Sequence, residues 1–200
     1  MKKKLLFLSL IFVILVFSLA LLSSCGKGTK GLEFIEAMWL FGLSPENIDI
    51  VVHRESILHS AVEYIDNSII AQLSVPDMRL CVQYALSAPR KNPAVIDELD
   101  LAEIAQLTFK RPDTDTFVLL KTAMKAMSLG GAVPAVLNAA NEVAVAAFLQ
   151  EKIGFTDIFD SVTQVVSDMS GKSNVHTLDG IIEADREARR YTEKILFEKG

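Results

Sequence analysis

A lysine and two glutamates open the first helical segment after a short Gly-rich stretch. Lys30, Glu33 and Glu36 recur at a spacing of three, which brings them to one side of a helix. Two carboxylates placed in this way can bind one hard cation, because such cations prefer oxygen ligands. An acidic first turn that complements the helix dipole explains the same pattern. From the residues alone, we favour this second interpretation.

Two histidines lie in a region with strand character. His53 and His59 are six residues apart, so they share one face of an extended chain, but no zinc or triad pattern surrounds them. Further along, Asn138, Asn141 and Glu142 form either a buried polar network or the wet edge of an apolar helix. The sequence contains no phosphate loop, no G-x-G-x-x-G motif and no nucleophile elbow.

The segments that position these side chains form a mixed part and a helical part, joined by a proline-containing linker over 88–112. The mixed part is expected to hold a helix from Gly31 toward Gly42, a strand over 48–53, a hairpin of 60–65 and 68–73 around a two-residue Asp66-Asn67 turn, and a helix over 77–86 started by Pro76. The helical part is expected to hold helices over 115–128, 134–152, 157–169 with Thr156 as N-cap, and 179–197 with Thr177 or Leu178 near its cap. The predicted fold class is therefore α+β, in which a small sheet with helices is followed by an all-α bundle of four helices.

Composition limits the function classes. The 200 residues are 50% hydrophobic and 22% charged, which excludes a disordered, collagen-like or disulfide-framework chain. The net charge of −5 argues against nucleic-acid binding. The mean hydropathy of +0.34 is high for a soluble domain, and residues 1–24 account for most of the excess.

The amino terminus has the pattern of a secretory signal. Three lysines at positions 2–4 precede an apolar run over 5–22, and Leu22-Ser23-Ser24-Cys25 is similar to a bacterial lipobox. We therefore predict a leader over 1–25 with lipidation of Cys25. The alternative is an uncleaved membrane anchor. If Cys25 is acylated, Cys81 has no disulfide partner, and we expect it to be a small core residue.

Several motifs in order resemble the 1-deoxy-D-xylulose 5-phosphate reductoisomerase family over about residues 30–195. The motifs are Lys30-Gly31-Leu32-Glu33-Phe34-Ile35-Glu36-Ala37, Trp39-Leu40-Phe41, Val52-His53, Ser56-Ile57-Leu58-His59-Ser60, Ala71-Gln72-Leu73, Pro76-Asp77-Met78-Arg79, the segment 130–145 and Phe155-Thr156-Asp157-Ile158. The resemblance implies a cytoplasmic, homodimeric enzyme of the non-mevalonate isoprenoid pathway that acts on a sugar phosphate with NADPH and Mn²⁺ or Mg²⁺. It implies that 30–87 is part of the catalytic and dimerisation domain and that 113–200 is the carboxy-terminal helical domain.

The resemblance also assigns roles to individual residues. Glu33 matches a metal-binding carboxylate that also touches substrate, and Lys30 matches a substrate-contacting lysine. Pro76 and Met78 match the segment beside the nicotinamide. For Glu36 and His59 the resemblance supports no direct chemical role.

The sequence departs from the family pattern at several positions. Thr29 stands where the family has Asn, Arg54-Glu55 where it has Pro-Gln, and Asn67 where it has Gly. The family's dinucleotide-binding domain, its other two metal carboxylates and its active-site loop have no counterpart in this sequence.

We therefore expect an oxidoreductase fragment that is inactive alone. The alternatives are a non-catalytic, membrane-anchored lipoprotein that displays the helical domain, and an enzyme half completed by a separately encoded amino-terminal half. The export signal and the cytoplasmic chemistry of the family conflict.

Overall fold

The computed structural model describes residues 4–6 and 29–198, and it divides the chain into two compact units. We call residues 37–112 together with 4–6 the sheet unit, and residues 29–36 together with 113–198 the helical unit. The α+β class is confirmed. Of the predicted leader, only Lys4–Leu6 is described, and Cys25 lies outside the described residues. Among the residues that the structure describes, no helix is both long and apolar enough to cross a bilayer.

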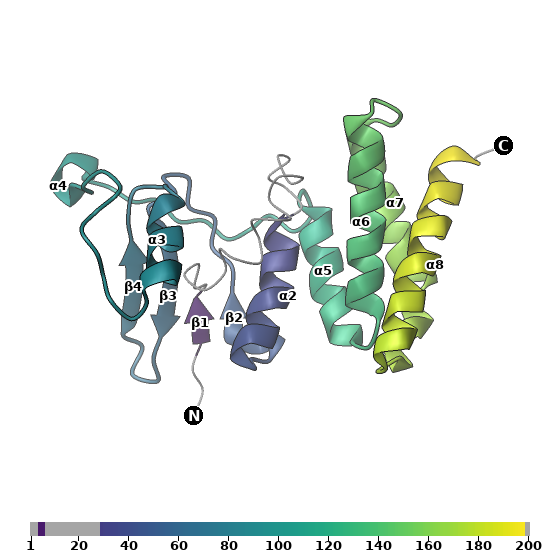
Figure 1. The fold of residues 1–200 in the computed structure, drawn as a ribbon, viewed down its shortest axis with the longest axis horizontal. Helices are drawn as coiled ribbons and strands as arrows, with labels where there is room; N and C mark the ends of the chain where they lie inside the picture. Colours follow the sequence, from purple (N-terminus) through teal and green to yellow (C-terminus); the bar gives the residue numbers. More distant parts are fainter. Residues whose placement is uncertain (1–3, 7–28, 199–200) are drawn as a thin grey trace. The chain divides into compact units, whose positions relative to one another are not determined.

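The sheet unit is built on four strands in the order β2-β1-β3-β4 (Figure 1). The strands are β1 (Lys4–Leu6), β2 (Ile48–Asp49), β3 (Leu58–Glu63) and β4 (Ile69–Leu73). β1 is parallel to β2 and antiparallel to β3, and β3 is antiparallel to β4. The helices of this unit are the 3₁₀ turn η1 (Pro45–Asn47), α3 (Arg79–Ser87) and the short α4 (Leu101–Ile104) within the predicted linker.

The strand predicted over 48–53 is shorter in the structure, where β2 ends at Asp49. Beyond it, only Val52 pairs, in an isolated bridge with Lys110. The chain leaves the sheet because the His53 ring binds residues of two loops. Its Nδ1 lies 2.9 Å from the carbonyl oxygen of Thr108, and its Nε2 accepts the Ile57 N–H at 3.1 Å.

The predicted β3–β4 hairpin is confirmed, but its loop is longer than two residues. Tyr64 N–H donates to the carbonyl of Ser68, so the turn spans 64–68. Asp66 widens the loop, because its Oδ1 accepts hydrogen bonds from the Ser68 backbone N–H and hydroxyl at 3.0 and 2.7 Å. Of the two predicted turn residues, only Asn67 has a positive φ, of 63°.

The helix predicted to start at Pro76 starts later, at Arg79. The Asp77 carboxylate accepts the Arg79 N–H at 2.8 Å and holds residues 76–78 in a turn before the helix. On α3, Cys81 is buried, as predicted.

The helical unit holds four packed helices, as the apolar pattern predicts (Figure 1). They are α5 (Val118–Leu129), α6 (Val133–Leu149), α7 (Phe155–Asp168) and α8 (Leu178–Phe197), with the 3₁₀ turn η2 (Ser170–Asn174) between the last two. Thr177 caps α8 by accepting the Gly180 N–H, as expected. The N-cap of α7 is Gly154 rather than Thr156, because Asp157 accepts the Gly154 N–H at 2.7 Å.

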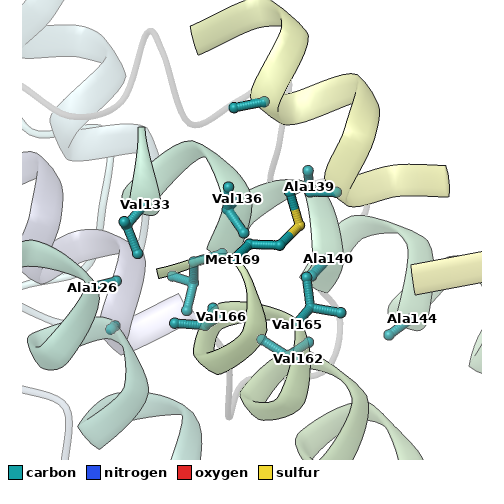
Figure 2. Packing of buried hydrophobic residues seen from close by; sticks show 14 of the residues in the cluster. Ala126, Val133, Val136, Ala139, Ala140, Ala144, Val162, Val165, Val166 and Met169 are labelled. Carbon is teal, nitrogen blue, oxygen red and sulfur yellow. The ribbon is translucent and has the colours of Figure 1, made fainter. Parts of the chain in front are cut away.

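Small and β-branched side chains fill the core of this unit (Figure 2). α7 contributes three fully or almost fully buried valines, and α6 and α8 contribute alanines that allow the helices to approach closely. The core residues labelled in Figure 2 are Ala126, Val133, Val136, Ala139, Ala140, Ala144, Val162, Val165, Val166 and Met169.

At the edge of this core, a half-exposed ionic network joins α6 to α8. Arg189 contacts Glu142 at 2.6 Å and Asp185 at 2.8 Å, and Asn138 donates to Glu142 at 3.0 Å. Of the two interpretations of the polar positions on α6, the wet edge of the helix is therefore correct for Asn138 and Glu142.

Candidate functional site

The candidate metal and substrate residues lie on α2 (Thr29–Phe41), a helix of 13 residues. Leu32 and Ile35 pack against the core of the helical unit, and Phe34 is completely buried. Gly31 is packed so closely that a Cβ at this position would lie 2.7 Å from the Cβ of Ala123 on α5. The first half of α2 is therefore firmly seated, and Glu33 and Glu36 remain half-buried beside its packed face. The backbone of Lys30 lies in the first turn.

The electrostatics of α2 distinguish its two glutamates. Burial, followed by repulsion from Glu33, raises the pKa of Glu36 from 4.5 to about 7. This is the strongest perturbation of a carboxyl group among the described residues. Desolvation disfavours the charged form, and the second carboxylate adds to that effect. Glu36 thus retains a proton at pH values where an ordinary glutamate is ionised.

Replacement of this carboxyl group is predicted to change how stability depends on pH. Because the pKa of Glu36 is higher in the folded than in the unfolded state, the folded state binds more protons between pH 4.5 and 7. The wild type therefore loses stability as the pH rises through that window. Glu36→Gln has no such proton, so its free energy of unfolding rises relative to the wild type from pH 5 to pH 8.

Urea unfolding at pH 5 and pH 8 measures this difference. Glu193→Gln is a suitable control, since Glu193 is exposed on α8. Identical pH dependence of the wild type and Glu36→Gln would contradict the prediction.

The candidate nicotinamide residues lie in the turn between β4 and α3. Ser74 is buried and anchors this turn: its N–H donates to the Ile57 carbonyl, and its own carbonyl lies 3.2 Å from Nε2 of His59. His59 therefore positions the turn through the backbone. Pro76 and Met78 follow on the surface, where Met78 is 57% exposed.

An ion pair between Asp77 and Arg79, which the sequence analysis does not name, brackets Met78. The Arg79 guanidinium donates to Asp77 from Nε at 2.9 Å and from an Nη atom at 2.6 Å. These hydrogen bonds hold the pKa of Asp77 below its usual range. The pair fixes the backbone on both sides of Met78, whose side chain is exposed. The sequence signal was the Asp-x-Arg spacing before a helix.

A second interaction missed by the sequence analysis uses a residue that departs from the family pattern. Glu55 accepts the Thr108 hydroxyl at 2.6 Å and lies 2.8 Å from Nδ1 of His53. The hydroxyl bond is the main cause that lowers the pKa of Glu55. Since Nε2 accepts the Ile57 N–H, Nδ1 is the ring nitrogen that carries a proton. His53 is thus a structural residue that ties the 106–110 segment to the start of β3.

The described residues do not by themselves form a divalent metal site. No group of three or more His, Cys, Asp or Glu side chains converges in this part of the chain. Glu33 and Glu36 supply carboxylates from one helix only, whereas Mg²⁺ requires six ligands in octahedral geometry.

A depression of about 480 Å³ in the helical unit contains none of the predicted site residues. In it, Tyr191 donates to Asp168 at 2.8 Å, and Glu187 accepts from Lys172 at 2.6 Å. Its lining consists of Asp168, Met169, Glu187, Arg190, Tyr191 and Lys194.

Comparison with protein families defines the class to which this protein belongs. Residues 73–191, more than half of the chain, match the DXP reductoisomerase C-terminal domain. The chain belongs to the DXP reductoisomerase family.

Curated relatives extend the match to the α2 region. The chain is 50% identical over 167 residues to the 1-deoxy-D-xylulose 5-phosphate reductoisomerase of Chlorobium limicola, and the match covers 84% of this chain and 44% of the relative. It is 48% identical over 166 residues to that of Ectopseudomonas mendocina, covering 83% and 42%. The chain thus spans less than half the length of these relatives.

Solved structures of reductoisomerases are also similar to this chain. The Zymomonas mobilis enzyme in complex with NADPH superposes with a TM-score of 0.79 at 40% identity, over 88% of this chain and 46% of that one. A DOX-P reductoisomerase in complex with NADPH, fosmidomycin and magnesium gives a TM-score of 0.81 at 37% identity, over 90% and 46%.

The site residues of this chain fall into two groups. Lys30, Glu33 and Glu36 lie together on α2 in the helical unit. Pro76 and Met78 lie in the sheet unit, on the turn that His59 supports. The sequence-based division placed residues 30–36 with the sheet. In the structure they group with the helices, because Leu32 and Ile35 pack on that core.

Proposed function

We propose that this chain is the later part of a 1-deoxy-D-xylulose 5-phosphate reductoisomerase and is catalytically inactive alone. The reaction of the complete enzyme is the NADPH-dependent conversion of its sugar phosphate to 2-C-methyl-D-erythritol 4-phosphate in the non-mevalonate pathway of isoprenoid synthesis. The observation that carries the proposal is the 50% identity over 167 residues, which extends well beyond the carboxy-terminal domain. The match covers 44% of that relative.

Each matched residue has a role in this proposal. Lys30 binds the substrate as a cation, and Glu33 binds both substrate and Mg²⁺ or Mn²⁺. A metal held by Glu33 together with carboxylates from the amino-terminal half would polarise the substrate carbonyl. Pro76 and Met78 offer an apolar contact to the nicotinamide. The packing of Phe34 and the hydrogen bonds around Ser74 support these assignments, since they hold both segments rigidly.

The other metal carboxylates and the dinucleotide-binding domain would be supplied by a separate amino-terminal half. A single family carboxylate leaves most coordination positions of the metal open, which explains why the chain alone is expected to be inactive. We also propose that the assembled enzyme is a cytoplasmic homodimer, as the family resemblance implies.

The test is NADPH oxidation with the sugar phosphate and Mn²⁺ or Mg²⁺. The purified chain alone should show no turnover above background. Mixing it with a separately produced amino-terminal half should produce turnover, which Glu33→Ala abolishes and the exposed control Glu193→Ala leaves unchanged. Turnover by the chain alone that Glu33→Ala removes would contradict the proposed inactivity.

A second candidate function is that of a membrane-anchored lipoprotein without catalysis. The observation in its favour is the Leu22-Ser23-Ser24-Cys25 sequence after an apolar run. In cells fed radiolabelled palmitate, label should appear on the wild type and disappear in Cys25→Ala. Absence of label from both would remove this candidate.

A further inference from the structure

β2 and β3 leave a space between them in the sheet, which we call the gap, and β1 occupies it. β2 and β3 do not pair with each other in the order β2-β1-β3-β4 (Figure 1). β1 separates them, with Leu5 opposite Ile48 on one side and opposite Val62 on the other. Since strands lie about 4.8 Å apart, the gap is one strand wide.

Residues of the two bordering strands are buried with β1 in place. Ile48 is 6% exposed on β2, and Ser60 and Ala61 are each 2% exposed on β3. Backbone N–H and C=O groups at such positions need hydrogen-bond partners, because water does not reach them. Residues 48–198 supply no strand between β2 and β3.

The amino-terminal residues satisfy both borders at once. Lys4–Leu6 is parallel to β2 and antiparallel to β3, and the register places Lys4 opposite Glu63. The same three residues overlap the start of the apolar run that has the pattern of a leader.

We propose that the space between β2 and β3 is a strand-acceptor site and that its occupant is Lys4–Leu6 of the same chain. The amino-terminal segment is then a structural strand of the folded protein. A segment that is paired on both sides cannot be threaded through a membrane at the same time. Folding of the sheet unit and export of the leader therefore exclude each other. This inference is independent of the proposed catalytic function.

Cysteine cross-linking of the full chain tests the register. Cys25 and Cys81 are replaced by serine, and Leu5→Cys is combined with Val62→Cys. Facing residues of antiparallel strands have Cα atoms about 4.5–5.5 Å apart, within disulfide range. The matched control combines Leu5→Cys with Ile70→Cys. Ile70 is opposite Val62 on β4, two strand spacings or about 9.6 Å from the β1 position, which is beyond disulfide range.

The chain is made by cell-free translation without membranes and oxidised at low concentration. We expect the 5–62 pair to give at least about ten times more intramolecular disulfide than the 5–70 pair, equivalent to about 1.4 kcal/mol. Equal yields from the two pairs in chains with native circular dichroism would overturn the proposal.

Hydrogen exchange of the unmodified chain gives a second measurement that needs no variant. Protection of amides in Lys4–Leu6 to the level of β3 amides supports the proposal. Exchange of Lys4–Leu6 at the unprotected rate would overturn it.

Discussion

Phe34→Ala is expected to lower the free energy of unfolding by about 3–5 kcal/mol. Phe34 is 0% exposed and is one of the largest fully buried side chains among the described residues. Its removal leaves a cavity on the buried side of α2. We expect this loss to release the helix that positions Glu33, so a complemented enzyme would also lose activity.

Trp39→Ala is the matched control for this prediction. Trp39 is a larger aromatic residue on the same helix, but it is 76% exposed. Its replacement should change the free energy of unfolding by less than about 1 kcal/mol. Urea unfolding followed by circular dichroism measures both variants. Equal destabilisation by the two substitutions would show that burial on α2 does not determine its stability.

The second large effect is expected from Gly31→Ala. This substitution should lower the free energy of unfolding, although helix propensity alone favours alanine over glycine. Alanine normally stabilises a helix interior by about 1 kcal/mol relative to glycine. At position 31 the new Cβ would lie 2.7 Å from the Cβ of Ala123 and 3.4 Å from the Leu119 carbonyl. Backbone and a short side chain cannot move aside cheaply, so we expect a net loss of about 1–3 kcal/mol.

A double-mutant cycle identifies the cause of this loss. Ala123→Gly removes the atom that Gly31→Ala would meet, so the double variant should recover at least about 1 kcal/mol relative to the sum of the single changes. Gly171→Ala serves as the control, because a Cβ at Gly171 meets nothing within 4 Å. Additive single effects, or a stabilised Gly31→Ala, would contradict the close contact between α2 and α5.

Local signals in the sequence predict the helices well. The apolar spacing on α5–α8, the Thr177 cap and Gly42 with its positive φ of 58° after α2 depend on residues within one or two turns. The predicted bounds are wrong where a side chain contacts a residue that is distant in the sequence. The β2 strand stops early because His53 binds Thr108, which is 55 residues away. No local pattern at 48–53 contains that information.

The candidate site also combines features that local sequence predicts with features that depend on long-range packing. The spacing of Lys30, Glu33 and Glu36 predicts one helix face, but the pKa of Glu36 depends on its burial, which becomes visible only when α2 is packed. The Asp77–Arg79 pair is local and was visible as a spacing, although its role as a bracket of Met78 was not. β1 could not be anticipated, since its partners are Ile48, Asp49 and residues 61–63.

The contact between Gly31 and Ala123 also has a consequence for the time course of synthesis. Ala123 follows Gly31 by 92 residues, so at about 5–20 residues per second α2 waits roughly 5–18 s for its partner helix to be translated. A helix of 13 residues is only marginally stable in water by itself. During this interval the apolar side chains of α2 are available to chaperones and proteases. The carboxylates of α2 therefore reach their final positions late, after translation has passed the midpoint of the chain.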